Sequence, residues 1–194
     1  MGIHIVRHIP EKDTTYARNL LMHAQNSLIG SLVDDLDLLD EQPPLFNYES
    51  YQAYQKRNYF YDGLSLDEHQ VLEPFDRYAK RLEASHLIIV SISLQNLMLP
   101  GAFSCWLNAS LMRGIAWNTN NEKVESFLKN KKILIILGAI QEELEFARLQ
   151  VEMLNSMLSS LKPQALEIIL TSEPSISKDQ DLVASFIKKW EQVL

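Results

Sequence analysis

Two threonines stand where an N-terminal strand passes into a helix, and they could bind a phosphate. Thr14 and Thr15 follow the β-rich start 3–6 and precede a helical pattern. Free backbone N–H groups and the helix dipole favour an anion at such a helix start. Arg7 and His8, just upstream, are cationic or can become so. The alternative is that the threonines only cap the helix and that Arg7 is solvated.

The other residues that could do chemistry are isolated. One cysteine, Cys105, excludes an intrachain disulfide, and its place inside a helical pattern predicts a buried small apolar residue. His69 and His86 are not spaced as metal ligands with any nearby Asp, Glu or Cys pair, so we expect no metal site. The acidic run 34–37 is typical of a strand end and a solvated turn rather than of a cation site.

Five strand patterns alternate with five helical patterns along the 194 residues. The expected strands are 3–6, 32–39, 87–90, 133–137 and 166–170, and the expected helices are 14–26, 65–84, 100–112, 142–161 and 179–194. Unbroken Ile/Leu/Val runs indicate strands covered on both faces. Right-handed crossovers then predict a doubly wound, five-stranded parallel sheet in a three-layer α/β domain, and the length predicts one domain over 1–194. Ligands of such sheets lie beyond the carboxyl ends of the strands, which singles out the loops 8–15, 92–99 and 138–142.

Local signals mark several of these elements. Ser65 and Glu68 form a capping box, and Pro74 predicts a kink in the helix that follows.

The long connection 40–64 holds five tyrosines and two phenylalanines, and a connection of this length is usually functional or contains structure of its own. It could form a lid or a partner-facing wall, or it could lie as an arm on its own domain.

The segment 86–117 resembles the flavodoxin-like NAD(P)H:quinone oxidoreductases, and among them the bacterial FMN-dependent NADH-azoreductases. Without a gap, Asn96, Pro100 and Gly114 fall on positions of that family. The capped helix before this segment and the Lys131–Ile133 entry into the next strand also match. The resemblance implies a flavodoxin-like fold, an FMN cofactor, and NADH or NADPH as co-substrate.

The chain departs from the family at each cofactor loop. The family's Pro-Met-Tyr-Asn-Phe is replaced by 93–97, Ser-Leu-Gln-Asn-Leu, which lacks the aromatic residues that flank the flavin. The family's Ser-Arg-Gly-Gly is replaced by 138–141, Gly-Ala-Ile-Gln, although glycines allow close approach of the backbone. The phosphate-binding serines become His8 and then the run 14–16, and the family's Phe-x-Tyr turn becomes Trp-Asn-Thr at 117–119.

The resemblance implies a cofactor site built from three loops, with a substrate pocket beside it. The implied cofactor-binding residues are His8, Thr14, Thr15, Tyr16, Leu94, Gln95, Asn96, Leu97, Gly138, Ala139, Ile140 and Gln141, and the implied pocket residues are Trp117 and Tyr59. No catalytic side chain is needed, because the flavin carries the reaction. The family also implies a homodimer in which the helix 100–112 lies near the interface and each site borrows from the partner.

These observations predict an FMN-dependent NAD(P)H oxidoreductase of the quinone or azo reductase type, with a small-molecule electron acceptor. The alternative is a degenerate flavodoxin-fold protein without flavin, which acts as a non-catalytic binding or partner subunit. A net charge of -7 argues against a nucleic-acid partner. No signal-peptide pattern and no apolar run of ~18 residues is visible, which predicts a cytoplasmic protein without a membrane partner.

Overall fold

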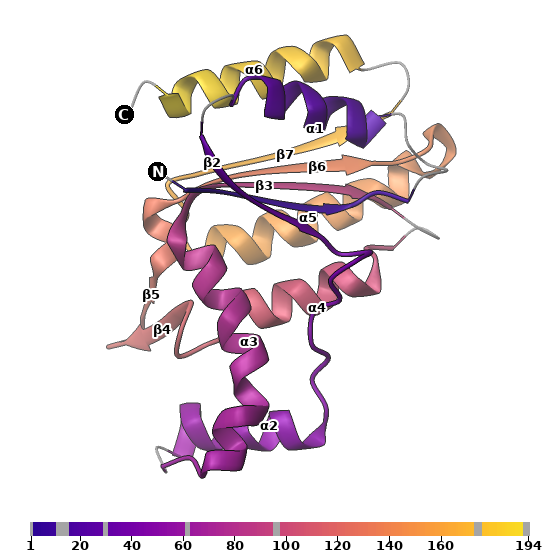
Figure 1. Cartoon of the computed structure of the whole chain (residues 1–194). Coiled ribbons are helices and arrows are strands. Elements are labelled where there is room, and N and C mark those ends of the chain that lie inside the picture. Colours follow the sequence, from indigo (N-terminus) through magenta and orange to yellow (C-terminus); the bar gives the residue numbers. More distant parts are fainter. Residues whose placement is uncertain are drawn as a thin grey trace.

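A parallel five-stranded sheet forms the middle layer of the computed structural model (Figure 1), which describes residues 2–10, 16–28, 31–60, 63–94, 98–172 and 176–191. The strand order is β2-β1-β3-β6-β7. The strands are β1 Gly2–His8, β2 Leu32–Asp37, β3 Ser85–Ser93, β6 Lys132–Gly138 and β7 Ala165–Thr171. All four neighbouring pairs are parallel, which confirms the predicted fold class.

Helices cover both faces of this sheet (Figure 1). One face is covered by α1 Tyr16–Asn26 and α6 Ile176–Glu191, and the other by α3 Leu66–Ala84, α4 Gly101–Ser110 and α5 Leu144–Ser160. Each face has its own buried cluster: Leu20 and Ile5 belong to the first, and Val6, Phe103 and Leu158 to the second. Burial of these side chains removes apolar area from water on both sides and holds the three layers together.

The connection 40–64 contains two helical elements rather than only a loop. The helix α2 Tyr48–Gln55 begins at a capping box in which Asn47 and Ser50 hydrogen-bond to each other's backbone. It continues directly into a π-helical turn, Lys56–Phe60. The sequence did not predict this helix, because it is only weakly amphipathic. A segment rich in tyrosines has no apolar periodicity that would distinguish a helix from a loop.

Other boundaries also differ from the prediction. The stretch at 117–119 is not a turn but the strand β4 Trp117–Asn120, which pairs antiparallel with β5 Lys123–Ser126. The α5 helix begins after a 3-10 turn at Gln141–Glu143, α4 spans 101–110 rather than 100–112, and Cys105 is half-buried rather than buried. The predicted capping box of Ser65 and Glu68 is confirmed at the start of α3. The helix then continues through Pro74 without interruption.

A buried lysine fastens the end of α3 to the sheet. Lys131 is 5% exposed, and its ammonium donates to the backbone carbonyls of Glu83 and Ser85. These carbonyls lie where α3 ends and β3 begins, so no further helical turn can satisfy them.

Replacement of Lys131 with methionine should therefore lower the free energy of unfolding by about 1–3 kcal/mol, because two acceptors lose their donor. Urea unfolding monitored by circular dichroism measures this change. The control is Lys129→Met at an exposed position, which should stay within about 0.5 kcal/mol of the wild type. Equal stabilities of the two variants would contradict this role of Lys131.

Candidate functional site

Three adjacent strands end at the same edge of the sheet and bring the predicted cofactor loops together. The strands β1, β3 and β6 are neighbours, and they end at His8, Ser93 and Gly138. The turns that follow are joined by backbone hydrogen bonds: Leu94 N–H donates to Gly138 C=O at 2.9 Å, and Ala139 N–H donates to Thr171 C=O at 3.1 Å. Parallel strand ends of this kind are where doubly wound sheets bind ligands.

The structure brings four of the predicted cofactor residues to this edge in buried positions: His8, Leu94, Gly138 and Ala139. Tyr16 is half-buried at the first residue of α1. Ile140 is 54% exposed and Gln141 is also exposed, so neither side chain fills the interior of the edge. The predicted residues Thr14, Thr15, Gln95, Asn96 and Leu97 lie outside the described residues.

A small apolar cluster forms the floor of this edge. Leu94, Ala139 and Ala147 are buried together, and partly buried Leu99, Leu144 and Leu170 pack against them. A Cβ on Gly138 would lie 3.0 Å from the Cβ of Ala17, so this glycine lets α1 approach β6. The floor thus offers an apolar surface of the kind that packs under a flat ring system.

His8 contributes a polar atom at the end of β1. Its side chain is 7% exposed, and within the described part of the chain its buried Nδ1 has no hydrogen-bond partner. Burial lowers the pKa of His8, so the imidazole is neutral at pH 7 and keeps one N–H to donate. Buried polar atoms normally have partners, so Nδ1 fits a ligand oxygen, such as one on a phosphate. The floor and His8 together fit FMN.

The predicted pocket residues lie elsewhere in the chain. Trp117 follows α4, and Figure 1 shows β4 at the end of the sheet opposite to the carboxyl ends of the strands. Tyr59 is joined to Trp117 through Arg113, whose guanidinium carbon lies 4.6 Å and 5.7 Å from the two ring centroids. Within one chain, therefore, the two predicted pocket residues lie together but apart from the cofactor residues. The separation arises because α4 leads the chain back from the carboxyl ends of the strands toward β4 (Figure 1).

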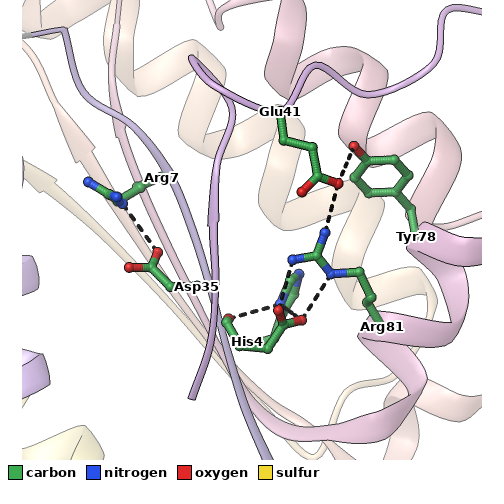
Figure 2. Close-up of polar contacts among 7 residues, drawn as sticks. His4, Arg7, Asp35, Glu41, Tyr78 and Arg81 are labelled. Carbon is green, nitrogen blue, oxygen red and sulfur yellow. Dashed lines mark hydrogen bonds and ion pairs between the residues drawn. The ribbon is translucent and has the colours of Figure 1, made fainter.

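A polar network beneath the first two strands was missed in the sequence (Figure 2). The acidic run 34–37 is a strand end as predicted, and the Asp34 side chain in β2 is 47% exposed; in addition, Asp34 accepts from Arg81 at 2.8 Å and contacts His4 Nδ1 at 2.9 Å. Glu41 accepts from Arg81 and from the Tyr78 hydroxyl, both at 2.9 Å. Burial, with Glu41 as acceptor, raises the pKa of Tyr78 to about 12, so the hydroxyl keeps its proton and donates.

This network joins β1, β2, α3 and the segment after β2, and we assign it a structural role. His4 is fully buried, and its Nε2 has no hydrogen-bond partner in the described ranges. The His4 ring lies beside that of Trp106, with ring centroids 6.4 Å apart. Protonation of His4 would bury a second N–H without an acceptor, which costs free energy.

Acidification should destabilise the fold because two buried histidines resist protonation. Burial lowers the pKa of His4 and of His8 below 6.5, so the unfolded chain binds these protons at a pH where the folded chain does not. Stability is then fully present above pH 6.5 and falls as the pH drops below that value. Hydrogen bonding from Arg81 lowers the pKa of Asp34, which removes further stability below pH 3.8.

Urea unfolding at pH values of about 7.5 and 5.5, on either side of the histidine range, tests this account. The variant His4→Asn keeps a donor for Asp34 but cannot titrate, so its loss of stability on acidification should be smaller than that of the wild type. The variant His69→Asn, at an exposed position on α3, should lose as much as the wild type. An unchanged loss in His4→Asn would show that His4 does not resist protonation.

The fold defines a flavodoxin-like α/β protein, and the solved structures that it resembles include oxidoreductases and a flavodoxin. An FMN-dependent NADH-azoreductase from Bacillus anthracis Ames Ancestor, solved with FMN, superposes with a TM-score of 0.76 at 12% identity over 95% of this chain and 98% of that one. An NAD(P)H:quinone oxidoreductase from Methanothermobacter marburgensis has a TM-score of 0.64 at 14% identity over 97% and 94%. A flavodoxin of Streptococcus pneumonia TIGR4 has a TM-score of 0.54 at 11% identity over the full length of both chains.

The resemblance to azoreductases and quinone oxidoreductases is therefore confirmed at the level of the fold. No protein-family model matches the sequence, and no curated protein matches it. In the described part of the chain, every helix is too short or too polar to span a membrane.

Proposed function

We propose that this chain is an FMN-dependent NAD(P)H oxidoreductase of the quinone or azo reductase type. The observation that carries the proposal is the buried edge of His8, Leu94, Gly138 and Ala139, where an apolar floor lies beside a buried imidazole nitrogen that has no hydrogen-bond partner among the described residues. The fold shared with FMN-dependent enzymes supports the same cofactor. When bound, FMN supplies the chemistry by accepting a hydride from NADH or NADPH and passing electrons to an acceptor.

The residues of this chain would bind and orient the cofactor. The His8 N–H would donate to a phosphate oxygen, and the Leu94–Ala139 floor would pack beneath the ring and exclude water from it.

Turnover tests the proposed activity. Purified protein with added FMN should oxidise NADH or NADPH in the presence of a quinone or an azo dye, at a rate well above that of free FMN. His8→Phe removes the N–H but keeps a buried ring, and it should weaken FMN binding about tenfold or more. A rate equal to that of free FMN would refute the proposed activity.

We also propose that two copies form a homodimer through α5. This helix exposes an apolar stripe at helical spacing, in which Phe146, Leu149 and Met153 are 52%, 60% and 52% exposed. Stripes of this kind mark interfaces. Light scattering should give a dimer for the wild type and a monomer for Met153→Glu, whereas a monomeric wild type would remove this proposal.

One observation favours the alternative of a flavin-free binding protein. The backbone N–H groups of Leu94 and Ala139 already donate within the chain, so they are not available to a flavin. In that case the edge would bind a smaller ligand through His8, and the purified protein would bind no FMN.

A further inference from the structure

A cavity opens between α2, the C-terminal turns of α4 and α5, and β4. Its volume is about 520 Å³, within the range of roughly 300–1,000 Å³ that is typical of small-molecule sites. Aromatic and aliphatic side chains form most of its wall, including Phe46, Tyr54, Leu107 and Trp117. The wall therefore presents flat apolar surfaces on which a ring can pack.

One cation stands in this wall. Among the described residues that line the cavity, Arg113 is the single charged side chain. Its guanidinium lies over the rings of Tyr59 and Trp117 and donates to Thr119 Oγ1 at 3.0 Å. Hydrogen bonding from Arg113 also lowers the pKa of Tyr59. These contacts hold a positive charge in a fixed place at the edge of an apolar surface.

The backbone around Arg113 is also fixed. Trp117 Nε1–H donates to the Leu111 carbonyl at 2.8 Å, and the Gly114 N–H donates to the Trp117 carbonyl at the same distance. On the opposite side, Tyr54 and Phe46 meet edge to face with ring centroids 5.6 Å apart. A site whose walls are held in this way loses little entropy when a rigid ligand binds.

We propose that this cavity binds a small aromatic molecule that carries a carboxylate or a sulfonate group. The ring would pack on Trp117 and Phe46, and the anionic group would pair with Arg113. An ion pair beside apolar walls is stronger than one in water, and the planar guanidinium suits a carboxylate. A neutral ring of the same shape lacks this pairing, and a cationic one meets a like charge.

This site goes beyond the proposed oxidoreductase. It lies at the C-terminal turns of α4 and α5. His8 ends β1, and Leu94 follows β3, after which the chain enters α4. Binding in this cavity therefore does not depend on FMN. The sequence singled out Trp117 and Tyr59 as pocket residues but gave no reason to include Arg113.

Calorimetric titration with two matched compounds tests the proposal. 2-Naphthoate carries a carboxylate, and 2-naphthamide has the same rings and nearly the same shape without the charge. At a pH of about 7.5 the naphthoate should bind the wild-type protein about tenfold more tightly or better, because a hydrogen bond to a charged group is the difference between them.

Variants assign the binding to this cavity. Arg113→Met should weaken naphthoate about tenfold, to the level of the amide, and leave amide binding unchanged. Arg113→Lys keeps the charge and should retain most of the difference between the two compounds. Ser160→Phe places a ring in the cavity wall and should abolish binding of both compounds. Circular dichroism checks that each variant is folded, and Lys129→Met controls for the loss of an exposed cation elsewhere.

Three results would overturn the proposal: equal affinity for the two compounds, naphthoate binding that survives Ser160→Phe, or no heat of binding with the wild type. The last result would also be obtained if a second copy of the chain occupied the cavity, and it would overturn the proposal in that case too. FMN binding, measured in parallel, should be unchanged in Arg113→Met. A protein that binds naphthoate but not FMN would support this inference and contradict the proposed oxidoreductase. A protein that binds FMN but not naphthoate would contradict this inference and leave the proposed oxidoreductase standing.

Discussion

Gly114→Ala should lower the free energy of unfolding by about 2–5 kcal/mol. This loss is the sum of two costs: the strain of an alanine in the left-handed backbone conformation, and the overpacking caused by its methyl group. Gly114 has a φ of +85°, and a Cβ there would lie 1.9 Å from Oδ1 of Asn58. Asn58 is buried in the π-helical turn, and its Nδ2 donates to the Tyr54 carbonyl at 2.9 Å. The added methyl group would therefore displace the turn that carries Tyr59.

Urea unfolding measures the loss, and the chain offers a matched control. At Gly101, an added Cβ meets nothing within 4 Å, so Gly101→Ala should be neutral or stabilising by up to about 1 kcal/mol. The double variant Asn58→Ala/Gly114→Ala lacks the Oδ1 atom and should be less destabilised than the sum of the single variants. Exact additivity would show that the contact between Asn58 and Gly114 is not the cause.

Phe103→Ala should lower the free energy of unfolding by about 3–5 kcal/mol through loss of apolar burial and creation of a cavity. Phe103 is 0% exposed on α4 and stacks on Trp106 with ring centroids 5.5 Å apart. Both rings belong to the cluster between the sheet and α3, α4 and α5. The loss should loosen α4, whose last turn forms part of the aromatic cavity.

The control for this truncation is Phe60→Ala. Phe60 is 66% exposed in the π-helical turn, so its removal should stay within about 0.5 kcal/mol of the wild type. Thermal or urea unfolding of both variants decides the comparison. Similar losses for Phe60 and Phe103 would contradict the assignment of Phe103 to the core.

The sheet could be predicted from the sequence because its middle strands are continuous apolar runs. In the runs 87–90 and 133–137 every residue is buried by helices on both faces, and this burial is what an unbroken Ile/Leu/Val pattern indicates. The capping box at Ser65 likewise specifies a helix start from local hydrogen bonds alone. Such signals depend on near neighbours, so they can be recognised without a structure.

The parts of the candidate sites that could not be predicted depend on long-range contacts. The ion pair between Asp34 and Arg81 could not be predicted because the two residues are 47 positions apart in the sequence. Arg113 lies in an ordinary polar position in the sequence, and only packing brings Tyr59 and Trp117 around it. That the Nδ1 of His8 is buried without a hydrogen-bond partner among the described residues is a property of the folded edge, since any imidazole is solvated in an unfolded chain.

We propose that the edge formed by the ends of β1, β3 and β6 binds FMN. The most direct test of this proposal is the visible absorbance spectrum of purified protein that has been incubated with excess FMN and then desalted. We predict that the protein retains the flavin bands at one FMN per chain, and that His8→Phe retains less. A wild-type protein that emerges colourless from this treatment would contradict the claim.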